Sequence, residues 1–223
     1  MTSFTIDVKR ELRAAKQAAA NEFRQRMAAQ GTCVIRLISS PGAGKTSLLA
    51  ETAKRMRPQN SIAILVGDVE TDRDQQRLAP FAPTVQITTG GACHLELSLV
   101  QSALPKLNLA TPADFLFLED IGNLICPASH DLGEHLRVLL LSSTEGDDKP
   151  QKYPKAVRTS QMMVITKSDL LPHVPFNVEH AVKDAQAIQP EMNAIVLSSL
   201  TGHGIEAWCN ALLAQREKML ACE

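Results

Sequence analysis

Residues 38–49 read ISSPGAGKTSLL and join an apolar segment to a helical pattern through a loop of Ser, Pro and Gly. In this setting Gly42 and Gly44 let backbone N–H groups turn inward, and the N-terminus of the following helix adds a dipole that favours an anion. Lys45 can then reach the terminal phosphates of a nucleotide, and the Thr46 hydroxyl can bind Mg²⁺. The pattern GxxxxGK[ST] asks for Gly at its first position, where this chain has Ser, so a Gly-rich turn that merely starts a helix is the alternative.

Apolar segments alternate with helical patterns along the rest of the chain, which is typical of an α/β domain. The expected strands are 33–38, 62–66, 84–88, 114–119, 137–142, 162–166 and 194–198, and the expected helices are 6–29, 45–56, 94–104, 178–188 and 205–220. Because the strands are short continuous apolar runs, both of their faces should be covered, which indicates a mostly parallel sheet with helices on both sides. The sequence therefore predicts an α/β domain over residues 31–223, preceded by a helix within residues 1–30 that packs on it.

Composition limits the class of partner. The chain has 223 residues, 44% of them hydrophobic, and a formal net charge of -1, so charge suggests neither nucleic acid nor an anionic membrane surface. No stretch approaches the roughly 18 apolar residues of a membrane span, and the first residues lack the apolar core of a signal peptide, so we expect a cytoplasmic protein. The 5 cysteines, an odd number scattered through an α/β pattern, argue against a disulfide framework.

Residues 166–169, TKSD, follow an apolar segment late in the chain. The Asp169 carboxylate can accept both N1–H and N2–H of guanine, and adenine offers no such pair of donors, so this residue favours GTP. Lys167 would lay its aliphatic stem along the base. The next expected strand is followed by Ser199 and Leu200, which we add to the base-binding residues. The motif is short, and a solvated strand end is the alternative.

Carboxylates stand at the ends of two further expected strands, where open parallel sheets bind ligands. Asp68 and Glu119 are placed to hold Mg²⁺ directly or through water, and Gly122 offers an N–H to a γ-phosphate. Asp120 is the rival of Glu119, and because side chains alternate along a strand only one of the two should face the site; we favour Glu119. Three charged residues nearby fit a switch segment and a solvated helix face about equally well: Asp72, Asp74 and Arg77.

The segment GGACHLE places Cys93 next to His94 after two glycines, which permit a turn that aims both side chains at one point. Two ligands are too few for a closed tetrahedral site, but a two-fold dimer would double them and suit Zn²⁺ or Ni²⁺. A packed thiol beside a partly exposed imidazole is the alternative. Among the other cysteines, Cys33 and Cys209 are expected in the core and Cys222 in a mobile terminus.

Six motifs together resemble one family. SSPGAGKT, GDVETDRDQQR, TTGGACHLE, EDIGNLICPA, TEGDDKPQKYP and TKSDL occur in the order found in HypB, the GTPases that help insert nickel into [NiFe]-hydrogenases. The resemblance runs from about residue 30 to the C-terminus and implies a P-loop domain of about seven strands, of the SIMIBI class whose members dimerise around nucleotide. In this family Ser at the first loop position is usual. The chain departs at EDIGN, where the family more often has Glu-Asn before the Val-Gly, and in lacking the N-terminal cysteine-rich and His-rich motifs of some members.

The resemblance also implies a function. It implies a nickel metallochaperone for [NiFe]-hydrogenase that hydrolyses GTP and couples its nucleotide state to dimerisation and to metal binding and release. It carries the Ni²⁺ or Zn²⁺ role onto Cys93 and His94 and adds Cys126, which follows closely behind Gly122. The implied partners are a second copy of the chain, a partner nickel metallochaperone and the hydrogenase large subunit. Because no arginine finger is identifiable in the sequence, we predict slow intrinsic hydrolysis.

The expected site residues follow from these motifs. Catalysis is assigned to Lys45, Asp68 and Glu119, and Mg²⁺ to Thr46, Asp68 and Glu119. GTP or GDP is expected to contact Gly42, Ala43, Gly44, Lys45, Thr46, Ser47, Gly122, Lys167, Asp169, Ser199 and Leu200. His130 and His135 are expected at solvated positions, with an auxiliary ligand role as the alternative.

Three other functions stay open from the sequence. A urease-accessory GTPase would also handle nickel, but it would show Cys-Pro-His where this chain has Ala-Cys-His. A metal-binding protein gated by nucleotide would show negligible hydrolysis. An ATP-using enzyme of the same fold would not depend on the carboxylate of Asp169.

Overall fold

A sheet of seven strands forms the centre of the computed structural model, which describes residues 2–70 and 72–221. The strands are β1 (Cys33–Ser39), β2 (Ile62–Asp68), β3 (Thr84–Thr88), β4 (Phe115–Glu119), β5 (Leu136–Ser142), β6 (Met162–Thr166) and β7 (Asn193–Val196). Their order is β3-β2-β4-β1-β5-β6-β7, and every pairing is parallel. All residues of β1, β4, β5 and β6 are buried, as the continuous apolar runs predict.

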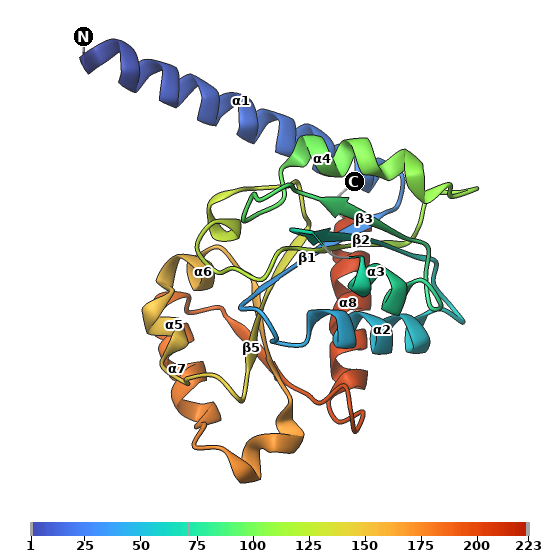
Figure 1. Ribbon diagram of the computed structural model, residues 1–223, viewed down its shortest axis with the longest axis vertical. Helices are drawn as coiled ribbons and strands as arrows, with labels where there is room; N and C mark the ends of the chain where they lie inside the picture. The colour runs from blue at the N-terminus through green and yellow to red at the C-terminus, as the bar shows by residue number, and fades with distance from the viewer. Residues whose placement is uncertain (1, 71, 222–223) are drawn as a thin grey trace.

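Helices cover both faces of this sheet (Figure 1). One face carries α2 (Lys45–Met56), α3 (Arg73–Leu78) and α8 (Ile205–Leu220). The other carries α1 (Thr2–Ala29) and α4 (Leu97–Ala103) over one half and α6 (Pro154–Arg158) and α7 (Val178–Ile188) over the other. Alternation along β1 serves both layers, because Ile35 and Leu37 pack under α2 and α8 while Val34 packs under α1. The expected α/β architecture is confirmed.

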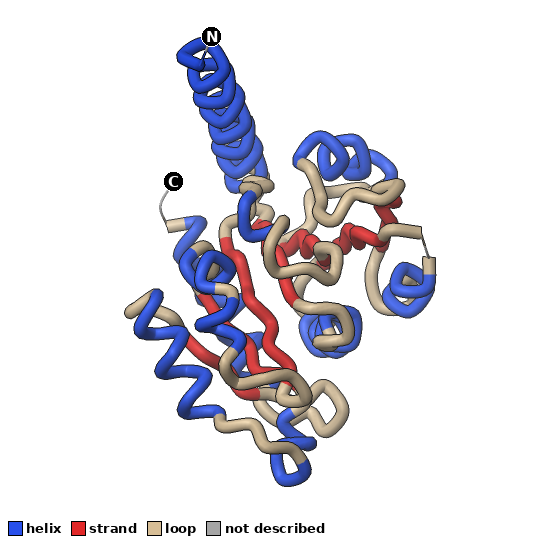
Figure 2. Tube along the Cα trace, turned by 60° about the vertical axis from the view of Figure 1, so that its left-hand side comes forward, coloured by secondary structure: helices blue, strands red, loops and turns tan. Residues whose placement is uncertain are grey.

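Among the residues of the long helix α1 whose side chains the structure describes, burial is confined to the last turns. Its residues 10–19 are exposed, and burial begins at Ala20 and continues at Phe23 and Met27. Figures 1 and 2 show the first part of the helix running away from the sheet. Arg24 ties the packed part to the core through an ion pair with Asp131, at 2.7 Å. The expectation of a leading helix packed on the domain therefore describes its C-terminal third.

The polar segment 143–160 is ordered as two short helices, α5 (Lys149–Lys152) and α6. Lys149 donates to the Ser40 hydroxyl at 2.7 Å, so this segment contacts the phosphate loop. Short 3₁₀ turns complete the chain at Leu104–Leu107, Pro127–Ser129 and Ser168–His173. None of the described helices combines the length and the apolar character that a membrane crossing requires.

The cysteines expected in the core lie there. Cys33 is fully buried in β1, and burial raises the pKa of its thiol to about 12. Cys209 is 8% exposed on α8, beside the buried Trp208. Trp208 donates its indole N–H to the Thr52 hydroxyl of α2 at 2.9 Å, which joins the two helices. The expectation for Cys222 lies outside the described residues.

Candidate nucleotide and metal site

A cleft of about 540 Å³ opens at the carboxyl ends of β1, β2 and β4. In the strand order, the chain runs from β1 toward β2 on one side and from β4 toward β5 on the other side. Open parallel sheets bind ligands at the position where the direction of the strand order reverses in this way. Nine of the residues expected at the site line the cleft: Gly42, Gly44, Lys45, Thr46, Ser47, Asp68, Glu119, Gly122 and Lys167. The tenth residue of this part of the site, Ala43, is buried. The structure thus brings the phosphate-binding and Mg²⁺-binding candidates together.

The loop between β1 and α2 has the geometry of an anion cradle. Gly42 and Gly44 have φ values of +73° and +94°, in the left-handed region that favours glycine. Lys45, 8% exposed, reaches back across the loop and donates to the Ser39 hydroxyl at 3.0 Å. Thr166, at the end of β6, donates to the carbonyl of Ala43 at 2.7 Å and fixes the loop from the other side. The serine that breaks the GxxxxGK[ST] pattern therefore holds the lysine in place.

Glu119 lies at the floor of the cleft with one oxygen bonded and one open. Its Oε1 accepts from the Thr46 hydroxyl at 2.8 Å, and its buried Oε2 has no hydrogen-bond partner among the described residues. Burial raises the pKa of Glu119 to about 7, against the lowering effect of the Lys45 ammonium. A cation beside Oε2 would favour the ionised carboxylate. With Asp68 also lining the cleft, the oxygen donors fit Mg²⁺.

Asp120 points the other way, as alternation along β4 predicts. It is 1% exposed and accepts hydrogen bonds from the Arg36 guanidinium and from the backbone N–H groups of Leu95 and Ile121. Its oxygens are therefore engaged inside the protein, whereas Glu119 keeps one for the cleft. Gly122 packs so closely on the phosphate loop that a Cβ there would lie 2.8 Å from Pro41 Cα.

The base-binding candidates lie at the ends of β6 and β7. Lys167 adopts a φ of +57° and donates to the carbonyl of Gly42 at 2.8 Å, so it bridges the two loops. Asp169 accepts a hydrogen bond from the Ser198 hydroxyl, and the same hydroxyl accepts from the N–H of Leu200 at 3.2 Å. Ser199 is half-buried and Leu200 is 85% exposed. Sequence reasoning missed Ser198, which orients the carboxylate that would read guanine.

The three charged residues for which a switch role and a solvated helix face were both open lie at the start of α3 and along it. Asp74 and Arg77 line the cleft, where Arg77 donates to the Ser47 hydroxyl at 3.0 Å and lies 3.3 Å from the Asp74 carboxylate. Asp72 is exposed and accepts from the Gln76 side chain at 2.8 Å. Their place in the cleft favours a switch role for Asp74 and Arg77, whereas Asp72 fits a solvent-exposed helix end.

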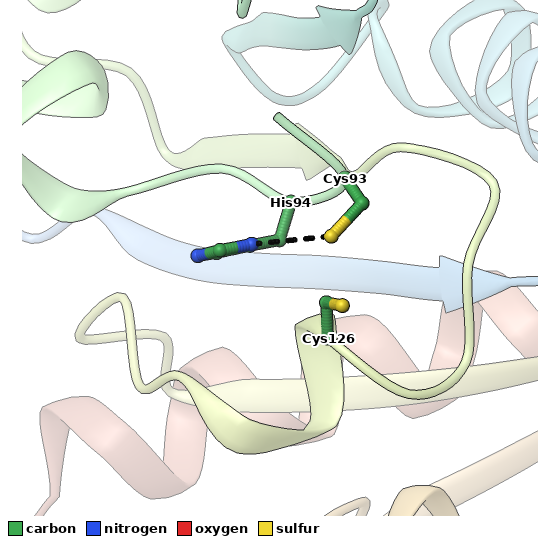
Figure 3. A group of neighbouring side chains, drawn as sticks. All are labelled: Cys93, His94 and Cys126. Atoms are coloured by element: carbon green, nitrogen blue, oxygen red, sulfur yellow. Dashed lines mark hydrogen bonds between the residues drawn. The ribbon is translucent and has the colours of Figure 1, made fainter. Parts of the chain in front are cut away.

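Three potential metal ligands, Cys93, His94 and Cys126, lie close together on two loops (Figure 3). The ligand atoms of Cys93, His94 and Cys126 all lie within 4.8 Å of one another. Gly90 and Gly91, with φ values of +61° and +105°, make the turn that brings the first pair to Cys126. A hydrogen bond with Cys126 raises the pKa of Cys93, and burial together with His130 lowers the pKa of His94. One chain therefore supplies three soft or borderline donors, which suit Ni²⁺ or Zn²⁺.

His130 and His135 are half-buried, so the expectation of solvated positions holds only in part. The His130 ring stacks on His94 with 3.9 Å between centroids, and its Nδ1 lies 2.9 Å from the carbonyl oxygen of Cys126. His135 Nδ1 accepts from the N–H of Val34 at 2.9 Å, and burial lowers the pKa of this imidazole. His135 therefore fixes the start of the central strand, while His130 packs against the metal candidates. Sequence spacing could not separate these two positions.

Comparisons with known proteins agree with this geometry. The family model described as the CobW/HypB/UreG nucleotide-binding domain matches residues 33–196. The hydrogenase maturation factor HypB of Escherichia coli (strain K12) is 42% identical over 198 residues, covering 88% of this chain and 68% of that protein.

Solved structures show the same relationship. The crystal structure of HypB from Helicobacter pylori in complex with nickel has a TM-score of 0.86 and 35% identity, covering 92% of this chain and 96% of that one. That of HypB from Archaeoglobus fulgidus has a TM-score of 0.83 and 34% identity, covering 91% and 99%. By its phosphate loop, its parallel sheet and these matches over most of its length, the chain belongs to the HypB family of P-loop GTPases.

Proposed function

We propose that this chain is a GTP-hydrolysing nickel metallochaperone that acts in the cytoplasm during maturation of [NiFe]-hydrogenase. One observation carries the proposal: the segment from Glu119 to Cys126 lines the nucleotide cleft at one end and supplies a thiol to the Cys93, His94 and Cys126 cluster at the other. A movement of this segment would reach both sites. The related HypB of Helicobacter pylori was crystallised with nickel, which supports the choice of metal.

The cleft residues divide the work of binding and hydrolysis. The backbone N–H groups of residues 42–46 and the Lys45 ammonium would bind the phosphates and stabilise the charge that develops as water attacks the γ-phosphate. Mg²⁺, held by Thr46, Asp68 and Glu119, would neutralise phosphate charge when bound. Asp169 and Lys167 would select and cover guanine, with Ser199 and Leu200 completing the base site.

Hydrolysis is proposed to be slow, as suits a switch. Of the described residues lining the cleft, Arg77 is the single arginine, and it is engaged by Asp74 and Ser47. The described lining of the cleft therefore offers no unengaged arginine for the phosphates. We expect a basal turnover well below the roughly 10 per second of an ordinary metabolic enzyme.

The metal cluster is proposed to act in a nucleotide-dependent homodimer. Three ligands from one chain leave at least one position open for Ni²⁺ or Zn²⁺, which a second copy or an acceptor can fill. The acceptors proposed for the nickel are a partner metallochaperone and the hydrogenase large subunit. Nickel is in this sense the cargo of the protein.

The first test is a Ni²⁺ and Zn²⁺ titration of the wild type and of Cys93→Ala. Stoichiometry and molecular mass are measured in GDP and in a non-hydrolysable GTP analogue. We expect metal binding at a dimer, an affinity that depends on the nucleotide, and loss of binding in the variant. Metal binding that is absent, or indifferent to nucleotide and variant alike, would refute the metallochaperone role and leave a GTPase of another purpose.

A further inference from the structure

Four buried charged side chains lie behind the metal cluster and have no part in the roles given above: Arg36, Asp120, Glu134 and Arg137. Their central pair is Arg36 and Asp120, both with fully buried side chains; Arg36 Nε donates to Asp120 Oδ2 at 2.8 Å, and its Nη2 bonds to the same oxygen. Taking such a pair out of water costs about as much as its attraction returns, so stability alone does not account for it. Its connections indicate another role.

The second oxygen of Asp120 is bonded to two loops at once. Oδ1 accepts from the N–H of Leu95 at 3.0 Å and from the N–H of Ile121 at 2.8 Å. Leu95 directly follows the ligand His94, and its side chain is fully buried against Gly67, where a Cβ would lie 2.8 Å from it. Ile121 lines the nucleotide cleft next to Gly122. A single carboxylate oxygen therefore joins the metal loop to the nucleotide loop.

Arg36 extends the connection to the other half of the metal cluster. Its Nη1 donates to the carbonyl oxygen of His130, which also accepts from Arg137 Nη2 at 2.8 Å. The His130 ring contacts both His94, by stacking, and the carbonyl of Cys126. The segments that carry Cys93 and Cys126 are thus both held by the Arg36 and Asp120 pair.

Asp120 is also joined directly to a residue of the nucleotide cleft. Asp120 follows Glu119, whose carboxylate bonds to Thr46 in the cleft, and the Asp120 N–H donates to the carbonyl of Leu37 in β1 at 3.1 Å. We infer that Asp120 is a positioning residue: its Oδ1 transmits a change at Glu119 or Ile121 to the Leu95 N–H, and so to His94 and Cys93. This inference rests on the proposed function, because it assumes that nucleotide and metal binding are coupled.

Two double variants separate this role from a structural one. Arg36→Gln/Asp120→Asn removes both charges but keeps a side-chain oxygen for the two N–H groups. Arg36→Gln/Asp120→Leu removes the same two charges and keeps the same number of side-chain heavy atoms at position 120, but it leaves the N–H groups of Leu95 and Ile121 without their acceptor. The readout is the ratio of the Ni²⁺ dissociation constants in GDP and in a non-hydrolysable GTP analogue, which a merely structural role would not move.

We expect a ratio of about tenfold or more in the wild type, corresponding to a typical coupling between sites. Arg36→Gln/Asp120→Asn should keep it within about threefold, and Arg36→Gln/Asp120→Leu should bring it near one while still binding both GTP and nickel. If the second variant keeps the ratio, or if both variants lose it, Oδ1 is not the link. A ratio of one in the wild type refutes the proposed coupling itself, and this inference falls with it.

A measurement on the unaltered protein covers the case in which the leucine variant does not fold. Amide hydrogen exchange of the 93–96 segment is followed in GDP and in the GTP analogue. A transmitted change alters the exchange rate of the Leu95 amide, which donates to Asp120. Equal rates in the two nucleotides would overturn the inference.

Discussion

The nucleotide cleft and the metal cluster are neighbours built in different ways. The cleft stands on the ends of strands and the start of α2, and its polar groups are held in advance, Lys45 by Ser39 and Thr46 by Glu119. The cluster stands on two loops, and Cys93 is exposed. Sites on regular elements keep their geometry better than sites on loops. The difference indicates that the cleft is preformed, whereas the metal ligands can move with the loops that carry them.

Lys45→Ala gives the largest expected effect. Because this ammonium is the main positive charge on the loop, we expect GTP hydrolysis to fall on the order of 100- to 1000-fold. Phosphate release measured with excess GTP checks the rate. Nickel affinity without nucleotide should change less than about twofold. If Lys45→Ala lowered nickel affinity as strongly as GTP hydrolysis, the nucleotide cleft and the metal cluster would not be independent sites.

Cys126→Ala should act on the other region. Loss of one of three ligands should weaken Ni²⁺ binding by at least the roughly 10- to 100-fold that supporting residues of metal sites contribute. Competition with a chromophoric chelator measures the affinity. Cys209→Ala, which removes a thiol buried in the core, is the matched control and should leave nickel binding unchanged. Equal losses in both variants would point to a global effect on folding.

Asp169→Asn tests whether the base-binding part of the cleft keeps its shape without this carboxylate. The Ser198 hydroxyl that now bonds to the carboxylate can bond to the new amide oxygen, so the loop should keep its shape. We expect GTP affinity to fall roughly 10- to 100-fold, as a charged hydrogen bond is lost, and xanthosine triphosphate to bind better. Fluorescent nucleotide competition tests both. An unchanged preference would mean that Asp169 does not read the base.

Asp131→Asn gives the smallest expected effect and tests the link between α1 and the core. Although burial raises it, hydrogen bonds from Arg24, Gly133 and Gln17 bring the pKa of Asp131 from 3.8 down to about 2. A depressed carboxyl pKa stabilises the fold above 3.8, and this stabilisation is lost as the pH falls through about 2. With solvent screening of a side chain that is 26% exposed, the contribution is about 1 kcal/mol.

Urea unfolding between pH 7 and pH 2 measures that contribution. The wild type should approach the Asp131→Asn variant in stability as the pH falls, and the two should differ most at neutral pH. Asp148→Asn removes a more exposed ion pair, with Lys152, and serves as the control with little expected effect. A constant difference between wild type and Asp131→Asn across this range would exclude the electrostatic explanation.

The contrast between a cleft built on regular elements and a metal cluster built on loops also explains what could be predicted from the sequence. The strands and the cleft depend on continuous apolar runs and on glycines at fixed spacing, which are local signals, and the structure has all seven expected strands. The expectation that only one of Glu119 and Asp120 faces the cleft also followed from a local rule, alternation along a strand. Residues that are close in sequence and belong to one element were thus assigned to the right part of the molecule.

Contacts between distant segments could not be predicted in this way. Arg36 appears in the sequence as a charge inside an apolar run, and only the fold shows that Asp120 and His130 are its partners. Likewise nothing local separates His130, stacked on His94, from His135, bonded to Val34. The three-ligand metal cluster could not be predicted from local sequence either, because only the tertiary structure brings Cys126 close to Cys93.

The central position of β1 has a consequence for synthesis on the ribosome. β1 pairs with β4 and β5 and with no earlier strand of the described sheet, so the strand that leads into the phosphate loop has no partner until Phe115–Glu119 has emerged. At roughly 5–20 residues per second, this leaves the loop unsupported for several seconds of translation. The nascent chain cannot bind GTP during that time, and the nucleotide can stabilise the protein only after β4 has been made.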